Sequence, residues 1–274
     1  MPVINTNNSA QFAQDALKAN AKAQSTAMQQ LATGNRINQA KDDAAGLSIG
    51  QNMTSQVRGL NQAVRNVNDG INMLQTADGA LVETSNMLQR MRELAVQSSN
   101  STNSVSQRKY LDNEFASLKE EINRINDNTS WNNAPLFGSA VANPPFVFQA
   151  GILSGQTISI ALGTMNTSGL TIEAATITTF TASQSAISSV DVAIERVNNA
   201  RSGMGATMNQ LSYSADNMVN ISTNIAASRS TVMDTDYAVA SAQLAKTQII
   251  SQAATAMLTQ ANQQPQSVLA LLKG

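Results

Sequence analysis

Apolar residues recur every three or four positions over a long central stretch of the sequence, the pattern of one face of an α-helix. The first part of this stripe consists of Val57, Leu60, Val64, Val67, Ile71 and Leu74, and a spacing of seven continues it through Leu81, Leu88 and Ala95. The pattern predicts a single helix from about Ala44 to Ser98, which would be roughly 80 Å long.

Gly46, Gly50, Gly59, Gly70 and Gly79 lie within or beside this predicted helix. Each costs about 1 kcal/mol relative to alanine in an isolated helix, so tertiary packing must compensate. Because a missing side chain lets backbones approach closely, we interpret these glycines as packing positions and not as helix breaks.

Two further stripes with the same spacing predict two more helices. A loop rich in serine, threonine and asparagine at 98–106 leads to a helix from Leu111 to about Asp127, and the two helices are expected to form an antiparallel pair. A long helix is expected from Ile187 to Ile225. The methionines at helical spacing are predicted core residues, namely Met204, Met208 and Met218 on this helix and Met87 and Met91 on the central one.

The sequence changes character after Trp131, because prolines and glycines between 135 and 151 exclude a helix there. Apolar residues then alternate with small polar ones, which is the pattern of a strand. We therefore expect a small β-hairpin at 146–162 and a weaker strand at 170–172.

The two ends carry matching stripes, at 10–31 and 237–272. Both have coiled-coil spacing, but many of their core positions are Ala, Thr, Ser or Asn. A lone helix with so thin an apolar seam buries too little surface to offset the entropy lost on ordering. We therefore expect both ends to be poorly ordered in the monomer and to fold when they pack against copies of themselves.

The composition excludes several classes of function. The 274 residues include no histidine and no cysteine, so we expect no enzyme activity, cofactor or metal. Lys plus Arg number 17 against 18 Asp plus Glu, which gives no electrostatic reason for a nucleic-acid or membrane partner. The apolar runs are too short to span a bilayer, and the N-terminal residues lack the features of a cleavable secretory signal.

Several motifs in a fixed order carry a resemblance to a known family. The segment 31–47, LATGNRINQAKDDAAGL, closely resembles the N-terminal signature of bacterial flagellin. Matches at 68–70 (NDG), 75–81 (QTADGAL) and 89–97 (QRMRELAVQ) follow in the family's order, as does 234–238 (DTDYA) near the other end. The resemblance covers residues 1–162 and 183–274, which leaves only a short segment where many flagellins carry outer domains.

The resemblance implies a mainly α fold: a long antiparallel helical bundle or coiled coil with a small β-hairpin, its terminal helices paired as an inner coiled-coil domain. Residues 1–42 and 233–274 would be the two halves of that domain. Residues 43–182 would form a rod domain of long helix, second helix, hairpin and short linker, and residues 183–232 its third long helix.

The resemblance further implies a structural subunit that polymerises into the extracellular flagellar filament used for swimming, exported without a cleaved signal peptide. Expected partners are copies of the chain, the filament cap, hook-junction proteins and an export chaperone. The alternative is the hook-filament junction protein, which shares flagellin-like ends but assembles in a single ring. Some flagellins carry a zinc peptidase insert, but its His-Glu-x-x-His motif needs histidines that this chain lacks.

Candidate site residues also follow from the resemblance. Arg90, Leu94 and Glu114 match positions by which the Toll-like flagellin receptor of animal hosts recognises the family, and Arg90 and Leu94 are expected on one helix face. The candidate residues of the junction between the terminal coiled coil and the long bundle are Arg36, Asn38, Asp42, Asp43, Asp234 and Asp236. The candidate self-assembly residues are Leu17, Leu31, Leu244, Leu258, Leu271 and Leu272.

Asp42 and Asp43 stand immediately before the predicted central helix. Carboxylates at this place stabilise the positive end of the helix dipole. We therefore expect them to cap the helix, and with no histidine in the chain we do not expect them to bind a metal.

Overall fold

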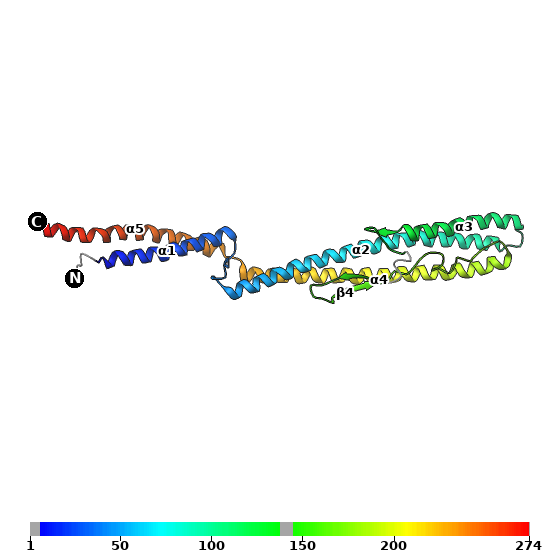
Figure 1. Cartoon of the computed structure of the whole chain (residues 1–274), viewed down its shortest axis with the longest axis horizontal. Helices are drawn as coiled ribbons and strands as arrows, with labels where there is room; N and C mark the ends of the chain where they lie inside the picture. Colours follow the sequence, from blue (N-terminus) through cyan, green and yellow to red (C-terminus); the bar gives the residue numbers. More distant parts are fainter. Residues whose placement is uncertain (1–5, 138–144, 274) are drawn as a thin grey trace. The chain divides into compact units, whose positions relative to one another are not determined.

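Helices make up most of the computed structural model, which describes residues 6–137 and 145–273, with side chains as far as Gln263 (Figure 1). The helices are α1 (Asn8–Thr33), α2 (Ala44–Ser98), α3 (Val105–Asn128), α4 (Phe180–Met233) and α5 (Tyr237–Lys273). The strands are β1 (Ser130–Trp131), β2 (Ala134–Pro135), β3 (Phe146–Gln149) and β4 (Thr157–Ile160). The predicted mainly α fold is confirmed, including both ends of the long central helix.

The chain divides into two compact units. One combines residues 1–57 with 224–274, and the other consists of residues 58–223. The boundaries between the two units fall inside α2 and α4. The boundaries of the predicted domains 1–42, 43–182, 183–232 and 233–274 fall elsewhere, so the units do not test those domains. The predicted domains stay a prediction, and each unit is described by itself.

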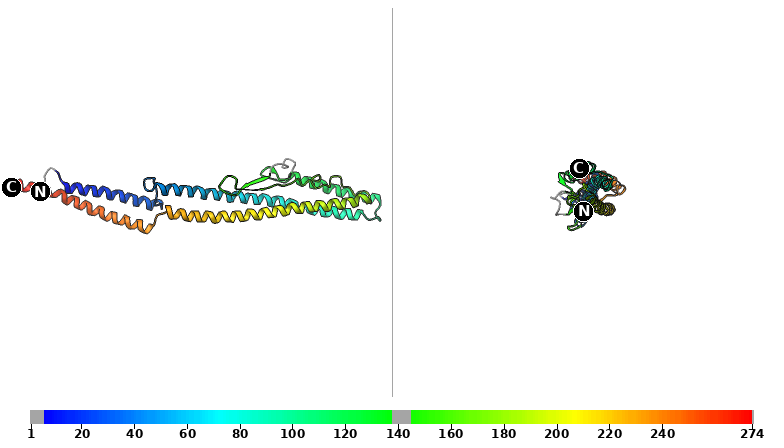
Figure 2. Two further views of the ribbon diagram at one scale, coloured as in Figure 1. Left: turned by 90° about the horizontal axis from the view of Figure 1, so that it is seen from below. Right: turned by 90° about the vertical axis from the view of Figure 1, so that its right-hand side faces the viewer.

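In the second unit α2 and α4 run side by side in opposite directions (Figure 1, Figure 2). Polar side chains join the two helices at intervals, and as the residue number rises on α2 it falls on α4. The pairs are Asn61 with Ser222, Asp78 with Arg201, Arg92 with Asp191 and Ser98 with Ser183. These contacts hold the two long helices in one antiparallel register.

The apolar stripe of α2 lies in the core of this unit. Its buried members are Leu60, Val67, Leu74, Leu81, Leu88 and Ala95. The other helices of the unit contribute further buried residues, namely Phe115 and Ile122 of α3 and Val190, Val197, Met204 and Leu211 of α4. Burying one leucine contributes about 1.5–3 kcal/mol, so this continuous stripe is the main source of stability. The predicted core methionines Met91, Met204 and Met218 are buried, whereas Met87 and Met208 are half-buried.

The segment 163–179, part of the predicted short linker, is bound along α3, and we call it the strap. One face of α3 supplies the polar side chains that hold it. Asp112 accepts from the backbone N–H of Ile177, Asn126 from Met165 and Asn123 from Thr167, and Lys119 Nζ donates to the carbonyls of Glu173 and Ala175. Three apolar residues of the strap, Leu170, Ile172 and Ile177, are buried.

The strand predicted at 170–172 is wrong. Leu170 and Ile172 are buried, as residues at alternate strand positions would be, but Thr171 between them has a φ of +60° and the backbone forms a turn. The N–H of Ile172 donates to the carbonyl of Thr167 at 2.9 Å. Two apolar residues on either side of a polar one fit a buried turn as well as a strand. A pattern of three residues is therefore too short to distinguish a turn from a strand.

The hairpin predicted at 146–162 is confirmed, since β3 and β4 pair antiparallel with Phe146 opposite Ile160. A second hairpin, formed by β1 and β2, was not predicted. Asn132 and Asn133 connect its strands with φ angles of +49° and +64°. Asparagine tolerates positive φ better than most residues, and two such residues in a row are typical of a tight hairpin turn. The Asn-Asn pair after Trp131 therefore indicates this hairpin turn in the sequence.

The predicted packing role of the glycines is confirmed for four of the five. A Cβ at Gly59 would lie 2.9 Å from Ile152, and one at Gly70 would lie 2.9 Å from the ring of Phe148, so the β3–β4 hairpin packs on α2 at these glycines. In the first unit a Cβ at Gly46 would collide with Ile37, and one at Gly50 with Met233.

The interpretation is wrong for Gly79, because a Cβ there would meet nothing within 4 Å in the part of the chain that the structure describes. Its place in the middle of α2 has no packing explanation within this chain.

Two alanine substitutions in α2 should therefore have opposite effects on the monomer. Gly79→Ala should raise the free energy of unfolding by about 0.5–1 kcal/mol, because alanine loses less backbone entropy and meets no neighbour. Gly70→Ala should lower it by about 1–3 kcal/mol, because the added methyl group displaces Phe148. Urea unfolding of the two variants measures both values, and equal shifts of the same sign would contradict the packing analysis.

Candidate assembly and recognition surfaces

In the first unit α1 and α5 form an antiparallel pair (Figure 2). Asn7 Nδ2 donates to the carbonyl of Ala261 at 2.8 Å, and Asn20 Nδ2 donates to that of Thr247 at 2.7 Å. Ala10, Asn20 and Ala27 are the buried residues of α1. This seam buries far less apolar surface than the α2 stripe does, so intrachain packing stabilises the terminal pair only modestly.

The buried polar contact between Asn20 and Thr247 lies in the middle of this pair. Asn20 is 9% exposed and Thr247 is 2% exposed, and Thr247 Oγ1 also donates to the carbonyl of Leu244 at 2.8 Å. A buried asparagine in a coiled coil loses its hydrogen bond if the helices slide, so it specifies register at a cost in stability. The pattern of small core residues predicted a thin seam but not which residues set its register.

An open groove of about 610 Å³ runs between α1 and α5, and we call it the terminal groove. Phe12, Ile250, Met257 and five alanines line it, with Asn8 and Ser9 as its polar members. Phe12 is 78% exposed and Met257 is 66% exposed. Large apolar side chains exposed around a groove mark a surface on which another molecule packs.

Sequence reasoning missed Phe12 and Met257, because neither lies on the apolar spacing that predicted the terminal helices. The predicted assembly residues Leu17, Leu31, Leu244 and Leu258 are instead half-buried in the terminal pair. Leu271 and Leu272 belong to α5, but their side chains lie outside the described residues. The role of all six in assembly stays a prediction.

The connections α1 to α2 and α4 to α5 are hydrogen-bonded to each other. Asn35 and Asp234 form an antiparallel bridge, in which the N–H of Arg36 donates to the carbonyl of Met233 at 2.7 Å and that of Thr235 to Gly34 at 2.9 Å. The guanidinium of Arg36 adds a hydrogen bond to the carbonyl of Val232 at 2.8 Å. The backbone of one connection therefore positions that of the other.

Gly34 is the residue that lets α1 end at this bridge. Its φ of +72° is one that glycine adopts without strain, and a Cβ there would lie 3.1 Å from Tyr237 Oη.

Three carboxylates close the turns at the same place. Asp43 Oδ1 accepts from the N–H of Gly46 at 2.8 Å, which caps the start of α2 and confirms the capping prediction for this residue. Asp42 does not cap the helix, since its Oδ2 accepts from the preceding N–H groups of Asn38 and Gln39. The capping prediction is therefore wrong for Asp42, whereas its place in the junction stays a prediction.

Asp236 Oδ1 caps α5 by accepting from the N–H groups of Ala238 and Val239 at 2.8 and 3.2 Å. The structure thus brings the candidate junction residues into one region, where they organise backbone turns.

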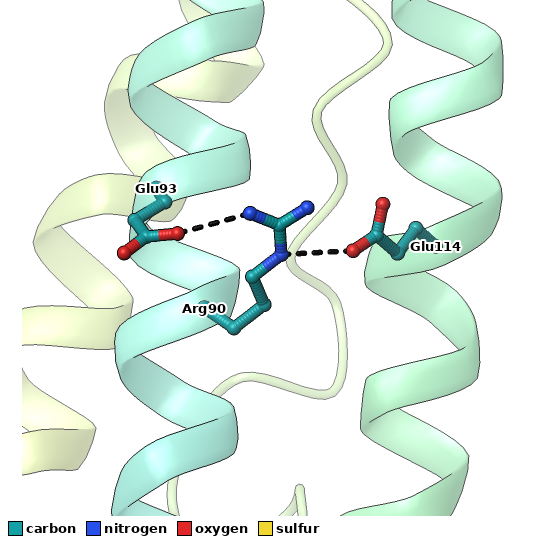
Figure 3. A network of polar contacts seen from close by, with 3 residues as sticks. All are labelled: Arg90, Glu93 and Glu114. Carbon is teal, nitrogen blue, oxygen red and sulfur yellow. Dashed lines mark hydrogen bonds and ion pairs between the residues drawn. The ribbon is translucent and has the colours of Figure 1, made fainter.

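In the second unit Arg90 links two carboxylates (Figure 3). Its Nε donates to Glu114 of α3 at 2.9 Å, and its Nη1 donates to Glu93 one turn further along α2 at 3.0 Å. The hydrogen bond to Glu114, and after it that to Glu93, raises the pKa of Arg90 above its usual value. All three side chains are about half exposed or more, so the network presents a permanent positive charge between two negative ones at the surface.

Leu94 does not share this surface. Its side chain is 0% exposed and lies in the core, so although the two residues are one turn apart on α2, only Arg90 reaches the surface. A step of four residues is slightly more than one helical turn, and here it separates the solvent-facing edge of α2 from its buried stripe. Glu93, which completes the Arg90 network, was not among the predicted residues.

Within the described residues no group of three or more carboxylates lies close enough to hold a metal ion, and no helix has the length and apolar character to cross a membrane. The surfaces described above are suited to packing and to polar recognition. They define a helical structural protein with an uncovered apolar groove on its terminal helix pair.

Comparison with known proteins identifies the family. A model of the bacterial flagellin N-terminal helical region matches residues 4–141, and one of the C-terminal helical region matches residues 187–272. The chain belongs to the bacterial flagellin family and is a structural subunit of the extracellular flagellar filament.

The similarity extends over nearly the whole chain. A flagellin of Halalkalibacterium halodurans is 44% identical over 273 residues, which cover 99% of this chain and 100% of that one. Flagellin A of Vibrio cholerae is 32% identical and is covered to 99%, but its alignment spans 377 positions, so it carries inserted sequence that this chain lacks. A crystal structure of Bacillus cereus flagellin, 32% identical, superimposes with a TM-score of 0.51 over 60% of this chain and 94% of its own.

Removing one carboxylate at a time should separate the two roles found at the start of α2. Asp43→Ala should speed hydrogen exchange at the amide of Gly46 and destabilise the first turn of α2 by about 1 kcal/mol, because a cap is lost. Asp42→Ala should leave that amide unchanged, and Asp43→Asn should retain most of its protection. An unchanged exchange rate in Asp43→Ala would contradict the capping assignment.

Proposed function

We propose that the terminal pair α1–α5 is the main contact surface between successive subunits of the filament, with the terminal groove at its centre. Residues 1–42 and 233–274 act as an inner coiled-coil domain, and residues 43–182 and 183–232 as the surrounding rod domain. The single observation that carries this proposal is the apolar groove, with Phe12 and Met257 largely exposed.

Two further features support the proposal. The seam between α1 and α5 buries mainly small residues, so the pair gains much of its stability only when other copies cover the groove. The register contact at Asn20 keeps both helices aligned while they associate. A head-to-tail contact that does not close on itself generates a helical polymer without any chemical step.

Phe12→Ser should raise the critical concentration for filament growth from seeds at least about tenfold, because a large apolar side chain no longer becomes buried. The monomer should keep its helical content, since Phe12 is exposed there. Val105→Ser, which changes an exposed apolar residue at the start of α3, is the matched control and should polymerise as the parent does. Sedimentation of seeded polymers measures both, and normal growth of Phe12→Ser would refute the role of the groove.

The filament cap, hook-junction proteins and an export chaperone at the C-terminal end are the further partners we propose. The hook-filament junction protein is the alternative assignment, and the same assay addresses it. Long filaments support the filament subunit, whereas growth that stops at a ring supports the junction protein.

We also propose that the monomer is recognised by the Toll-like flagellin receptor of animal hosts through the surface around Arg90 and Glu114. The support is geometric: Arg90 is held between Glu93 and Glu114 by two hydrogen bonds, so its guanidinium is presented in one orientation. An ordered, charged arginine loses little entropy on binding a partner. Leu94 supports this surface indirectly, because its buried side chain packs in the core beneath the α2 turn that carries Arg90.

Arg90→Ala should reduce receptor activation by the monomer at least about tenfold, as expected for an arginine at the centre of an interface. Its unfolding curve should match that of the parent, because exposed ion pairs contribute little to stability. Arg65→Ala removes another exposed arginine of α2 and should activate normally. A reporter-cell dose series decides the matter, and full activation by an Arg90→Ala, Leu94→Ala double variant would end the proposal.

A further inference from the structure

The methionines of this chain differ sharply in exposure. Met73, Met91, Met204 and Met218 are buried in the second unit, and several others are half-buried. Among the described residues the two most exposed are Met257, at 66%, and Met28, at 52%, and both lie on the terminal helix pair.

The two exposed methionines have different surroundings. Met257 lies in the terminal groove beside Phe12 and Ile250, where alanines form the remaining apolar wall. Met28 lies on α1 outside the residues that line this groove. Both thioethers are open to dissolved reagents in the monomer, but only one of them belongs to the apolar surface that assembly would bury.

Thioethers react with hydrogen peroxide by a two-electron step. A lone pair of the methionine sulfur attacks one peroxide oxygen, and a sulfur–oxygen bond forms as the oxygen–oxygen bond breaks. The departing hydroxide takes the proton that the transferred oxygen carried and leaves as water. The sulfur is oxidised to a sulfoxide and the peroxide is reduced. The product is a polar group where an apolar one stood, a change that disrupts methionine-containing interfaces.

We propose that Met257 is an oxidation-sensitive site through which hydrogen peroxide blocks subunit addition. This inference rests on the proposed function, in which a second copy of the chain covers the terminal groove. A sulfoxide at Met257 would have to be buried beside Phe12, Ile250 and alanines, which offer its oxygen no side-chain donor, in a groove whose polar lining residues are only Asn8 and Ser9. Burial would therefore replace the water around the sulfoxide oxygen with few donors. Incorporation into the filament shields the sulfur, so the sensitive species is the unassembled subunit.

The experiment treats the purified full-length monomer with limiting hydrogen peroxide, removes the peroxide with catalase and maps sulfoxides by peptide mass spectrometry. Met257 and Met28 should oxidise before Met73, Met91 and Met204. The critical concentration for growth from untreated seeds should then rise roughly tenfold. Treatment with a methionine sulfoxide reductase and a thiol should restore growth.

Two conservative variants distinguish the sites. After the same peroxide exposure Met257→Leu should polymerise as its untreated form does, whereas Met28→Leu should lose growth as the parent does. Rescue by Met28→Leu, or normal growth of a parent fully oxidised at Met257, would overturn the proposal. If Met257→Leu itself polymerises poorly, oxidised Met28→Leu is treated with the reductase, because Met257 is then the most exposed methionine left among the described residues. Growth that is lost on oxidation and restored by the reductase supports the proposal, and growth that oxidation does not change overturns it.

Preassembled filaments supply an independent readout. Met257 in filaments should oxidise several-fold more slowly than in monomers, and equal rates would overturn the proposal. A failure of the Met257 proposal can be distinguished from a failure of the proposed function. If untreated monomers do not extend seeds, assembly itself is refuted, whereas normal assembly with peroxide-insensitive growth refutes only the role of Met257.

Discussion

The unequal distribution of buried apolar surface is the constraint on which the rest of the structure depends. In the second unit the α2 stripe is buried from Leu60 to Ala95 against side chains of α3 and α4. In the first unit the buried residues of the seam between α1 and α5 are alanine, threonine and asparagine, and the leucines whose side chains are described there are only half-buried. The free energy from burial therefore concentrates in residues 58–223, and the terminal helices keep large apolar side chains such as Phe12 and Met257 uncovered.

Polar contacts then determine how the helices are aligned. Hydrogen bonds such as Asp78 with Arg201 align α2 with α4, and Asn20 with Thr247 aligns α1 with α5. The bridge between Asn35 and Asp234 joins the α1–α2 connection to the α4–α5 connection. Directional contacts suit this task because they are lost when a helix slides by a single turn, whereas a stripe of similar aliphatic residues tolerates that shift.

Two surfaces that stay exposed after folding differ in chemistry, and the difference fits the two roles proposed above, self-assembly and recognition by a receptor. The terminal groove is mainly apolar and its lining includes no charged residue, which suits close packing of identical copies, and a polar group introduced there would find only Asn8 and Ser9 as side-chain partners. The Arg90 network is charged and solvent-exposed, which suits recognition by a different molecule. Under the proposed function, the chain would present the terminal groove to its own copies and the chemically different Arg90 network to another molecule.

The amino-acid sequence alone determined the number, type and approximate limits of the helices, because apolar spacing is a local property that each segment carries by itself. The family followed from motifs such as 31–47 in a fixed order. Only the tertiary structure decided that Leu94 is buried while Arg90 is exposed, that 170–172 forms a turn within a strap, and that Phe12 and Met257 border a groove. Each of these three features depends on which other residues pack against the residue in question. Residues that are distant in sequence come into contact through tertiary packing, which a local sequence pattern does not show.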